Sequence, residues 1–186
     1  MKKLILPVLV ALCCLATYNK AEAQVDVTLN PIGILFGDFN VGADFALSNN
    51  FSIEAQVGFG TGKLGEADWR NIPVNVVGKY YLNPKRGADR FYVDAFLRFV
   101  SRNFAYADNS GFANYKSTRL GIGFGLGYKI VATKGFVFDI GLGFGRALAT
   151  TNKYEDSSGN QVEANWGNGI FLGKLGVGYR FGGGKD

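Results

Sequence analysis

The sequence lacks several residues on which catalytic and structural sites commonly depend. Histidine is absent from all 186 residues, and both cysteines, Cys13 and Cys14, lie near the N-terminus. Without histidine, an acyl-transfer or peptide-cleaving site has no imidazole base, and a serine nucleophile would need activation by a lysine or a carboxylate. No serine–lysine pair stands out along the chain. The sequence therefore predicts that the protein is not an enzyme.

The chain also has no apolar run of the roughly 20 residues that a membrane-spanning helix needs. Its longest run, from Leu4 to about Thr17, follows two lysines and precedes Ala21-Glu22-Ala23. This order of basic, apolar and small residues is typical of a cleaved secretory signal peptide. We expect residues 1–23 to be removed on export and residues 24–186 to form one domain. The exported chain would then contain no cysteine and no disulfide framework.

Signals for nucleic acid and nucleotides are missing as well. Loss of three lysines and one glutamate with the signal peptide lowers the net charge from +5 to +3, and no basic cluster is interleaved with aromatic residues. Gly141-Leu142-Gly143 is followed by Arg146 where a dinucleotide-binding loop needs glycine. Gly184-Lys185 lacks the remaining P-loop residues. We expect no nucleic-acid partner and no nucleotide cofactor.

Metal ligands are scarce too, because the exported chain has neither histidine nor cysteine. One group of oxygen ligands, Glu155, Asp156, Asn160 and Glu163, has the chemistry to hold calcium. The same residues are explained more simply as a solvated loop. We therefore predict no metal site.

What the chain has in abundance is glycine and aromatic residues, with 27 glycines and 15% aromatics. Between Lys116 and Arg146, two runs alternate large apolar residues with small or polar ones, and Ala132-Thr133-Lys134-Gly135 separates them. Side chains alternate across a β-strand, so each run predicts a strand with one bulky apolar face. A helix would place glycine at every second position, at about 1 kcal/mol each. The stretch is therefore predicted to be a β-hairpin.

The volume inside a small barrel decides which face of such strands points outward. An eight-stranded barrel has an interior only just wide enough for side chains to fill. Large apolar side chains cannot all fit inside, whereas glycines and a few charges can. An outward apolar face needs lipid, and this arrangement is typical of a transmembrane β-barrel. The alternative is a soluble, lipocalin-like barrel, which would expose its glycine faces to water and crowd the aromatic residues inside.

Eight period-two stretches follow one another along the exported chain. They cover about 25–35, 39–47, 51–60, 70–82, 91–103, the hairpin at 116–146, and 166–181. Pro31 predicts an irregular strand or a bulge in the first stretch. Turns near Asn49, Pro84 and Thr133 are short, whereas loops at 61–69, 105–115 and 149–165 are longer, as between the periplasmic and outer ends of bacterial barrels. The sequence predicts an all-β, eight-stranded antiparallel up-and-down transmembrane β-barrel.

Twelve charged residues are predicted by alternation to point into the barrel. They are Asp44, Glu54, Lys79, Asp94, Arg98, Arg102, Arg119, Lys129, Asp139, Arg146, Lys174 and Arg180. Buried charges persist when they are paired, so one interpretation is a salt-bridged plug that holds the barrel rigid. The other is a narrow path that favours anions, because eight of the twelve are basic.

The final strand, which ends Val177-Gly178-Tyr179-Arg180-Phe181, resembles the last strand of small outer-membrane barrels of the OmpA/OmpX kind. The opening Leu29-Asn30-Pro31-Ile32-Gly33 is similar to that of uncharacterised members of this group. The resemblance covers the exported chain as a pattern rather than as a residue motif. It implies a monomer in the outer membrane of a Gram-negative cell envelope, with membrane lipid around it.

The function that this resemblance implies is non-enzymatic. We expect a structural or surface-interaction role in which the loops at 61–69, 105–115 and 149–165 contact a protein partner. A small pore or transporter for ions or small apolar molecules is the alternative.

Overall fold

The computed structural model describes residues 24–35, 37–64, 67–106, 112–156, 161–163 and 167–182. The predicted signal peptide lies outside these residues. The elements are β1 (Val25–Leu29), α2 (Pro31–Leu35), β2 (Asp38–Ala46), β3 (Phe51–Leu64), β4 (Ala67–Tyr81), β5 (Arg90–Tyr106), β6 (Phe112–Val131), β7 (Phe136–Asp156), β8 (Gln161–Glu163) and β9 (Gly169–Phe181).

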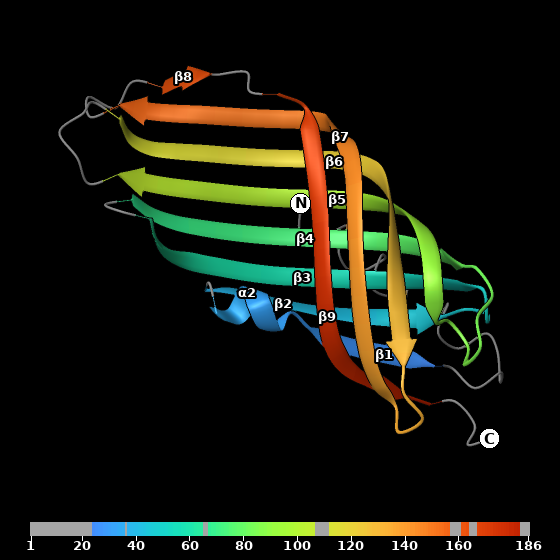
Figure 1. Cartoon of the computed structure of the whole chain (residues 1–186). Helices are drawn as coiled ribbons and strands as arrows, with labels where there is room; N and C mark the ends of the chain where they lie inside the picture. Colours follow the sequence, from blue (N-terminus) through green and yellow to red (C-terminus); the bar gives the residue numbers. More distant parts are fainter. Residues whose placement is uncertain are drawn as a thin grey trace, which may run out of the picture.

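Eight of these strands close into a ring of antiparallel pairs. Each ring strand pairs with the next along the chain, β9 pairs with β7, and β9 returns to pair with β1. The short β8 lies outside the ring and pairs only with the far end of β7. Figure 1 shows the closed ring, with β9 in red at the front and the green strands behind it. The predicted eight-stranded up-and-down barrel is confirmed.

The outward face of the ring carries the large apolar side chains. On the predicted hairpin, the cross-strand partners Phe124 and Phe144 are 75% and 68% exposed, and Leu142, two residues from Phe144 on the same strand, is also exposed. Their neighbours along the strands are buried or half-buried glycines. A belt of exposed apolar side chains around a closed barrel requires a hydrocarbon environment, so the soluble alternative is wrong. Among the described residues, no helix is both apolar enough and long enough to cross a membrane.

The two ends of the barrel differ. At the short-turn end, the connections at 47–50, 82–89 and 132–135 are brief. Gly135 has a φ of 86° in the last of these turns, a conformation that glycine adopts without strain. Just above this turn, the rings of Phe136 and Tyr179 lie 6.1 Å apart and those of Tyr179 and Phe181 5.2 Å apart, on the lipid-facing side. Such aromatic residues are typical of a membrane interface.

At the opposite end, the strands are longer than the sequence predicted. The expected loop at 61–69 is largely strand, because β3 continues to Leu64 and β4 begins at Ala67. β5 continues to Tyr106, β7 continues to Asp156, and β8 occupies part of the expected loop at 149–165. We call the part of β3–β8 that continues past the apolar belt the extended end. It was missed because polar strands outside lipid have no apolar alternation.

The first strand is shorter than predicted. β1 ends at Leu29, and the next residues form the single turn α2 rather than an irregular strand or a bulge. The Asn30 side chain accepts a hydrogen bond of 3.0 Å from the Gly33 amide, and Pro31 occupies the first helical position, where its missing N–H costs nothing. Five residues are too few for a periodic signal in the sequence.

Aromatic side chains from β5 fill the space beside the glycine faces of β6 and β7. A methyl group added to Gly127 would lie 2.3 Å from the Tyr92 hydroxyl, and one added to Gly143 would lie 2.7 Å from Phe96 Cε1. Tyr92 and Phe96 are both almost completely buried. The glycines are therefore required by the volume of these two rings.

Candidate functional site

Eight charged side chains form one connected cluster in the lumen near the short-turn end. This lumen network consists of four acids and four bases: Asp26, Asp44, Glu54, Asp139, Lys79, Lys129, Lys174 and Arg180. Most of these side chains are buried, and the charges balance. A charge-balanced set of ion pairs is the arrangement in which ionised groups persist away from water.

Lys79 on β4 is the hub of the network. Its Nζ lies 2.7 Å from Asp44 Oδ2, 2.6 Å from Glu54 Oε2 and 3.0 Å from Asp139 Oδ2. The ammonium group donates hydrogen bonds to Asp44 and Asp139, and Glu54 is its third ion-pair partner. Lys174 Nζ bridges Glu54 and Asp139 from the other side, at 2.5 Å from each.

The network continues to the β1–β9 pair, which joins the first and last strands of the ring. Lys129 Nζ lies 2.5 Å from Asp44 Oδ2 and 2.8 Å from Asp26 Oδ2. Arg180 donates to both oxygens of Asp26, at 2.6 Å from Nε and 2.8 Å from Nη2. A bidentate guanidinium–carboxylate pair fixes geometry as well as charge. Asp26 and Arg180 are direct partners across the β1–β9 pair.

Two tyrosines surround the network. The Tyr92 hydroxyl donates to Asp139 Oδ1 at 2.8 Å, and the Tyr81 hydroxyl donates to Asp44 Oδ2 at 3.2 Å. Lys79 Nζ lies 4.9 Å from the centre of the Tyr92 ring, and Lys129 Nζ lies 5.1 Å from that of Tyr81. These contacts satisfy carboxylate oxygens of the network and pack the cations against aromatic faces.

The connection between β4 and β5 closes the lumen below the network. Ala88 and Asp89 are buried there, and Ala88 packs with Tyr81 and Tyr92. Arg180 donates to the carbonyl oxygens of Ala88 and Arg86, which ties this turn to β9. The short-turn end therefore has a floor as well as a plug.

A cluster of buried apolar side chains lies above the network. Val77, Phe96, Ala147, Ile170 and Leu172 come from four strands and form one buried apolar cluster inside the barrel. Their positions follow from alternation: Val77 is two residues from Lys79 on β4, and Phe96 is four residues from Tyr92 on β5. This apolar cluster therefore fills one side of the lumen above the charge network.

Four of the predicted lumen charges stand apart from the network. Asp94 on β5 forms no ion pair among the described residues, and its Oδ1 is buried without a hydrogen-bond partner. Arg98 donates to Asn75 Oδ1 at 3.1 Å, and Arg102 to Asn71 Oδ1 at 3.4 Å. Arg119 has a buried Nε without a partner. The arginines lie toward the extended end, where Arg98 and Arg102 meet amides instead of carboxylates.

The prediction for Arg146 is wrong. Its side chain is exposed, and it pairs with Ile122, which is also exposed on the lipid-facing side of β6. The alternation of β7 itself places Arg146 on the face of Phe144 and opposite to that of Asp139. The sequence prediction missed Asp26, although its position between Val25 and Val27 gave the same alternation signal.

Three network carboxylates lie close enough to bind a metal ion, because oxygens of Asp44, Glu54 and Asp139 all lie within 4.8 Å of one another. Lys79 contacts all three, so an ammonium group takes the place that a cation would hold. For the other calcium candidate, Glu155 and Asp156 belong to β7 and Glu163 to β8, whereas Asn160 lies outside the described residues.

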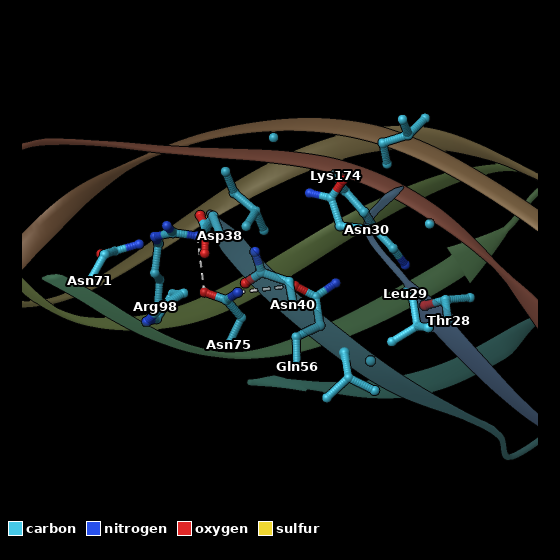
Figure 2. Close-up of a pocket in the computed structure, with 17 residues that line it drawn as sticks. Thr28, Leu29, Asn30, Asp38, Asn40, Gln56, Asn71, Asn75, Arg98 and Lys174 are labelled. Carbon is cyan, nitrogen blue, oxygen red and sulfur yellow. Dashed lines mark hydrogen bonds between the residues drawn. The ribbon is translucent and has the colours of Figure 1, made fainter. Parts of the chain in front are cut away.

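A separate cavity of about 120 Å³ lies in the other half of the lumen. Amide side chains line it: Asn40, Gln56, Asn71 and Asn75, together with Asp38, Arg98 and Lys174. Figure 2 shows Arg98, Asn75 and Gln56 in a row across this cavity, with Asp38 close to Arg98. Asn75 accepts from Arg98 and donates to Gln56 Oε1 at 3.0 Å. The cavity therefore offers a cation and several neutral hydrogen-bonding groups.

Residues 6–180 match the model of a family described as "Protein of unknown function (DUF3575)". The chain belongs to this family. Among curated proteins, none matches the sequence.

Solved structures share the barrel. A major outer membrane protein from Thermus thermophilus is similar, with a TM-score of 0.53 and 17% identity over 88% of this chain and 100% of that one. Ail, the attachment invasion locus protein of Yersinia pestis, has a TM-score of 0.45 and 13% identity, over 86% of this chain and 95% of that one. The Thermus protein shows the fold, that of a small outer-membrane β-barrel.

Proposed function

We propose that this member of the family is a non-enzymatic outer-membrane β-barrel that holds its extended end outside the cell as an interaction surface. The observation that carries the proposal is the division of the ring strands into two zones. On β6, Leu120–Tyr128 alternates exposed apolar residues with buried or half-buried glycines, whereas Asn114–Ser117 is polar and lies beyond that belt. The strands thus remain paired as a sheet beyond the apolar belt, where the lipid environment no longer forces the backbone to pair.

The orientation follows from the connections. Short turns at one end and long extensions at the other are typical of barrels whose short turns face the periplasm. The predicted signal peptide supports export. Among the described residues, the ring of a single chain leaves strand edges unpaired within the belt only at the β2–β9 seam, which is described below. The lumen network and its floor favour a rigid support over the alternative of a pore.

Cysteine labelling in intact cells tests the location and the orientation, because the exported chain has no cysteine of its own. A membrane-impermeant maleimide should label Lys116→Cys at once and Thr133→Cys only after the envelope is broken; both positions are exposed. Leu126→Cys, in the apolar belt, is the control and should stay unlabelled in both conditions. Labelling of Thr133→Cys alone in intact cells would reverse the proposed orientation.

The interaction role needs a separate test. Lys116 and Thr151 are both exposed on the extended end. A photo-crosslinking residue at either position should give a discrete adduct with a partner protein on living cells in their natural surroundings. The same residue at Thr133 is the matched control and should give none. Equal adducts at all three positions, or none at either extended-end position, would count against the proposed surface role.

A further inference from the structure

The barrel wall is incomplete beside β1. β1 pairs with β2 only from Val25 to Leu29, where Leu29 faces Val41, and with β9 only as far as Val177. Among the described residues, β9 continues from Gly176 back to Gly169 with β7 on one side and no strand on the other. One further backbone bond, from the Asn30 amide to the Asn40 carbonyl at 3.1 Å, ends the β1–β2 contact. Above Leu29, no strand pairing joins β2 to β9 among the described residues, and α2 contacts both strands. We call this unpaired boundary the β2–β9 seam.

The cavity of about 120 Å³ reaches this seam. Five consecutive residues of β9, Leu172 to Gly176, line it. Side chains of this stretch point to both faces, and its backbone has no strand partner on this side among the described residues, so the cavity lies along the free edge of the strand. Leu29 on β1 and Val41 on β2 line the cavity from the opposite side of the seam. The cavity thus connects the lumen with the lipid-facing side of the wall.

The two sides of this passage differ in chemistry. Outside, Leu29, Val41 and Leu175 lie on the apolar face of their strands. Inside, Arg98 has one hydrogen-bond partner, Asn75, and no carboxylate within ion-pair distance among the described residues. Lys174, by contrast, is already held by two carboxylates. Arg98 therefore has donors left for an anion, and the neighbouring Asp38 has a buried Oδ1 without a donor.

We propose that the cavity binds the head group of a membrane phospholipid, which enters through the β2–β9 seam while its acyl chain stays on the outside of the barrel. The phosphate would accept from Arg98, and a hydroxyl or amine of the head would donate to Asp38. A water molecule needs roughly 10–15 Å³ of such space, so the cavity accommodates a group of several heavy atoms. α2 contacts both β2 and β9, and its exposed Ile32, Ile34 and Leu35 extend the apolar surface beside the seam.

Native mass spectrometry of the full exported chain in a maltoside detergent tests this assignment. We expect lysophosphatidylethanolamine to remain bound, and a monoacylglycerol with the same acyl chain to be retained at least ten-fold more weakly. Arg98→Gln should reduce phospholipid retention about ten-fold, and Arg98→Lys should restore part of it. Arg119→Gln is the control, because it removes the same charge from the lumen without lining the cavity.

Glycerophosphoethanolamine, the head group without a chain, separates a lipid from a free organic phosphate. Strong binding of this probe would overturn the lipid assignment, as would equal retention in the wild type and Arg98→Gln. A second measurement keeps the proposal testable if Arg98→Gln does not fold. A photo-crosslinker at Leu175 should capture phospholipid after detergent exchange, whereas one at Leu97, exposed on β5 and three strands away from both sides of the seam, should lose it. Equal capture at both positions would contradict a specific site.

Discussion

Lys129 on β6 contacts Asp26 on β1 across the lumen, with 2.8 Å between Nζ and Oδ2. The two strands are not neighbours in the ring, and the residues are 103 positions apart. Lys79 with Asp139 and Lys174 with Glu54 also connect strands that are not neighbours in the ring. Ion pairs through the lumen therefore connect strands that are not neighbours, and substitutions of these residues should change the stability of the whole ring.

Asp139→Asn should destabilise the barrel by roughly 3 kcal/mol, because it leaves Lys79 and Lys174 short of one buried counter-charge. We expect the lower end of the range for a broken buried pair, since Glu54 still contacts both lysines. Urea unfolding in lipid vesicles measures the loss. Asp94→Asn is the control: Asp94 forms no ion pair among the described residues, so its substitution should cost nothing. Equal losses would mean that the network does not act as a unit.

Leu142→Arg should cost roughly 2–4 kcal/mol of folding stability in vesicles, because it places a charge at mid-belt on the lipid side. The matched control is Leu148→Arg on the same face of β7, six residues toward the extended end. There the cost should fall to roughly 0–1 kcal/mol, as expected near the interface. A harmless Leu142→Arg would show that this face does not contact lipid.

Gly143→Ala should destabilise by about 1–3 kcal/mol through overpacking, since the added methyl group would lie 2.7 Å from Phe96 Cε1. Adding Phe96→Leu should recover much of this loss, because it removes the ring edge. Gly169→Ala is the control, as no atom lies within 4 Å of its added methyl group. If the double variant is as unstable as Gly143→Ala alone, the clash is not with Phe96.

Lys79→Ala should create a divalent-cation site, because it leaves Asp44, Glu54 and Asp139 together without their shared ammonium group. Refolding this variant with calcium should raise its unfolding midpoint, by an amount that corresponds to about 2.7 kcal/mol at 100 times the Kd. The wild type, whose site holds the lysine, should show no such shift. A calcium effect of the same size in both chains would place the ion elsewhere.

No steady conductance is expected in planar bilayers, because the charge network and the floor fill the lumen at the short-turn end. The measurement is single-channel recording of the folded protein, with a large porin as the positive control. Stable anion-selective currents that diminish in Arg98→Gln would show that the lumen opens, and the pore alternative would replace the plug.

Much of the architecture could be predicted because lipid imposes a period of two on every residue within the belt. The predicted hairpin at 116–146 and the outward rings of Phe124 and Phe144 follow from that constraint. The extended end has no such constraint, so its strands were mistaken for loops. The partners of each lumen charge could not be predicted either, since alternation says that Lys79 points inward but not that it meets Asp139 from the opposite wall.

The pair between Asp26 and Arg180 joins the first strand to the last, and it lies where only five residues of β1 hold the ring closed. Both Arg180 and Lys174, two of the four bases of the network, belong to β9, so Asp26 has only Lys129 as its partner until β9 has been inserted. Glu54 and Asp139 likewise lack Lys174 until that moment and share only Lys79. A chain truncated before β9 would therefore keep four lumen carboxylates against two lysines, and this excess negative charge would be neutralised only when β9 pairs with β1.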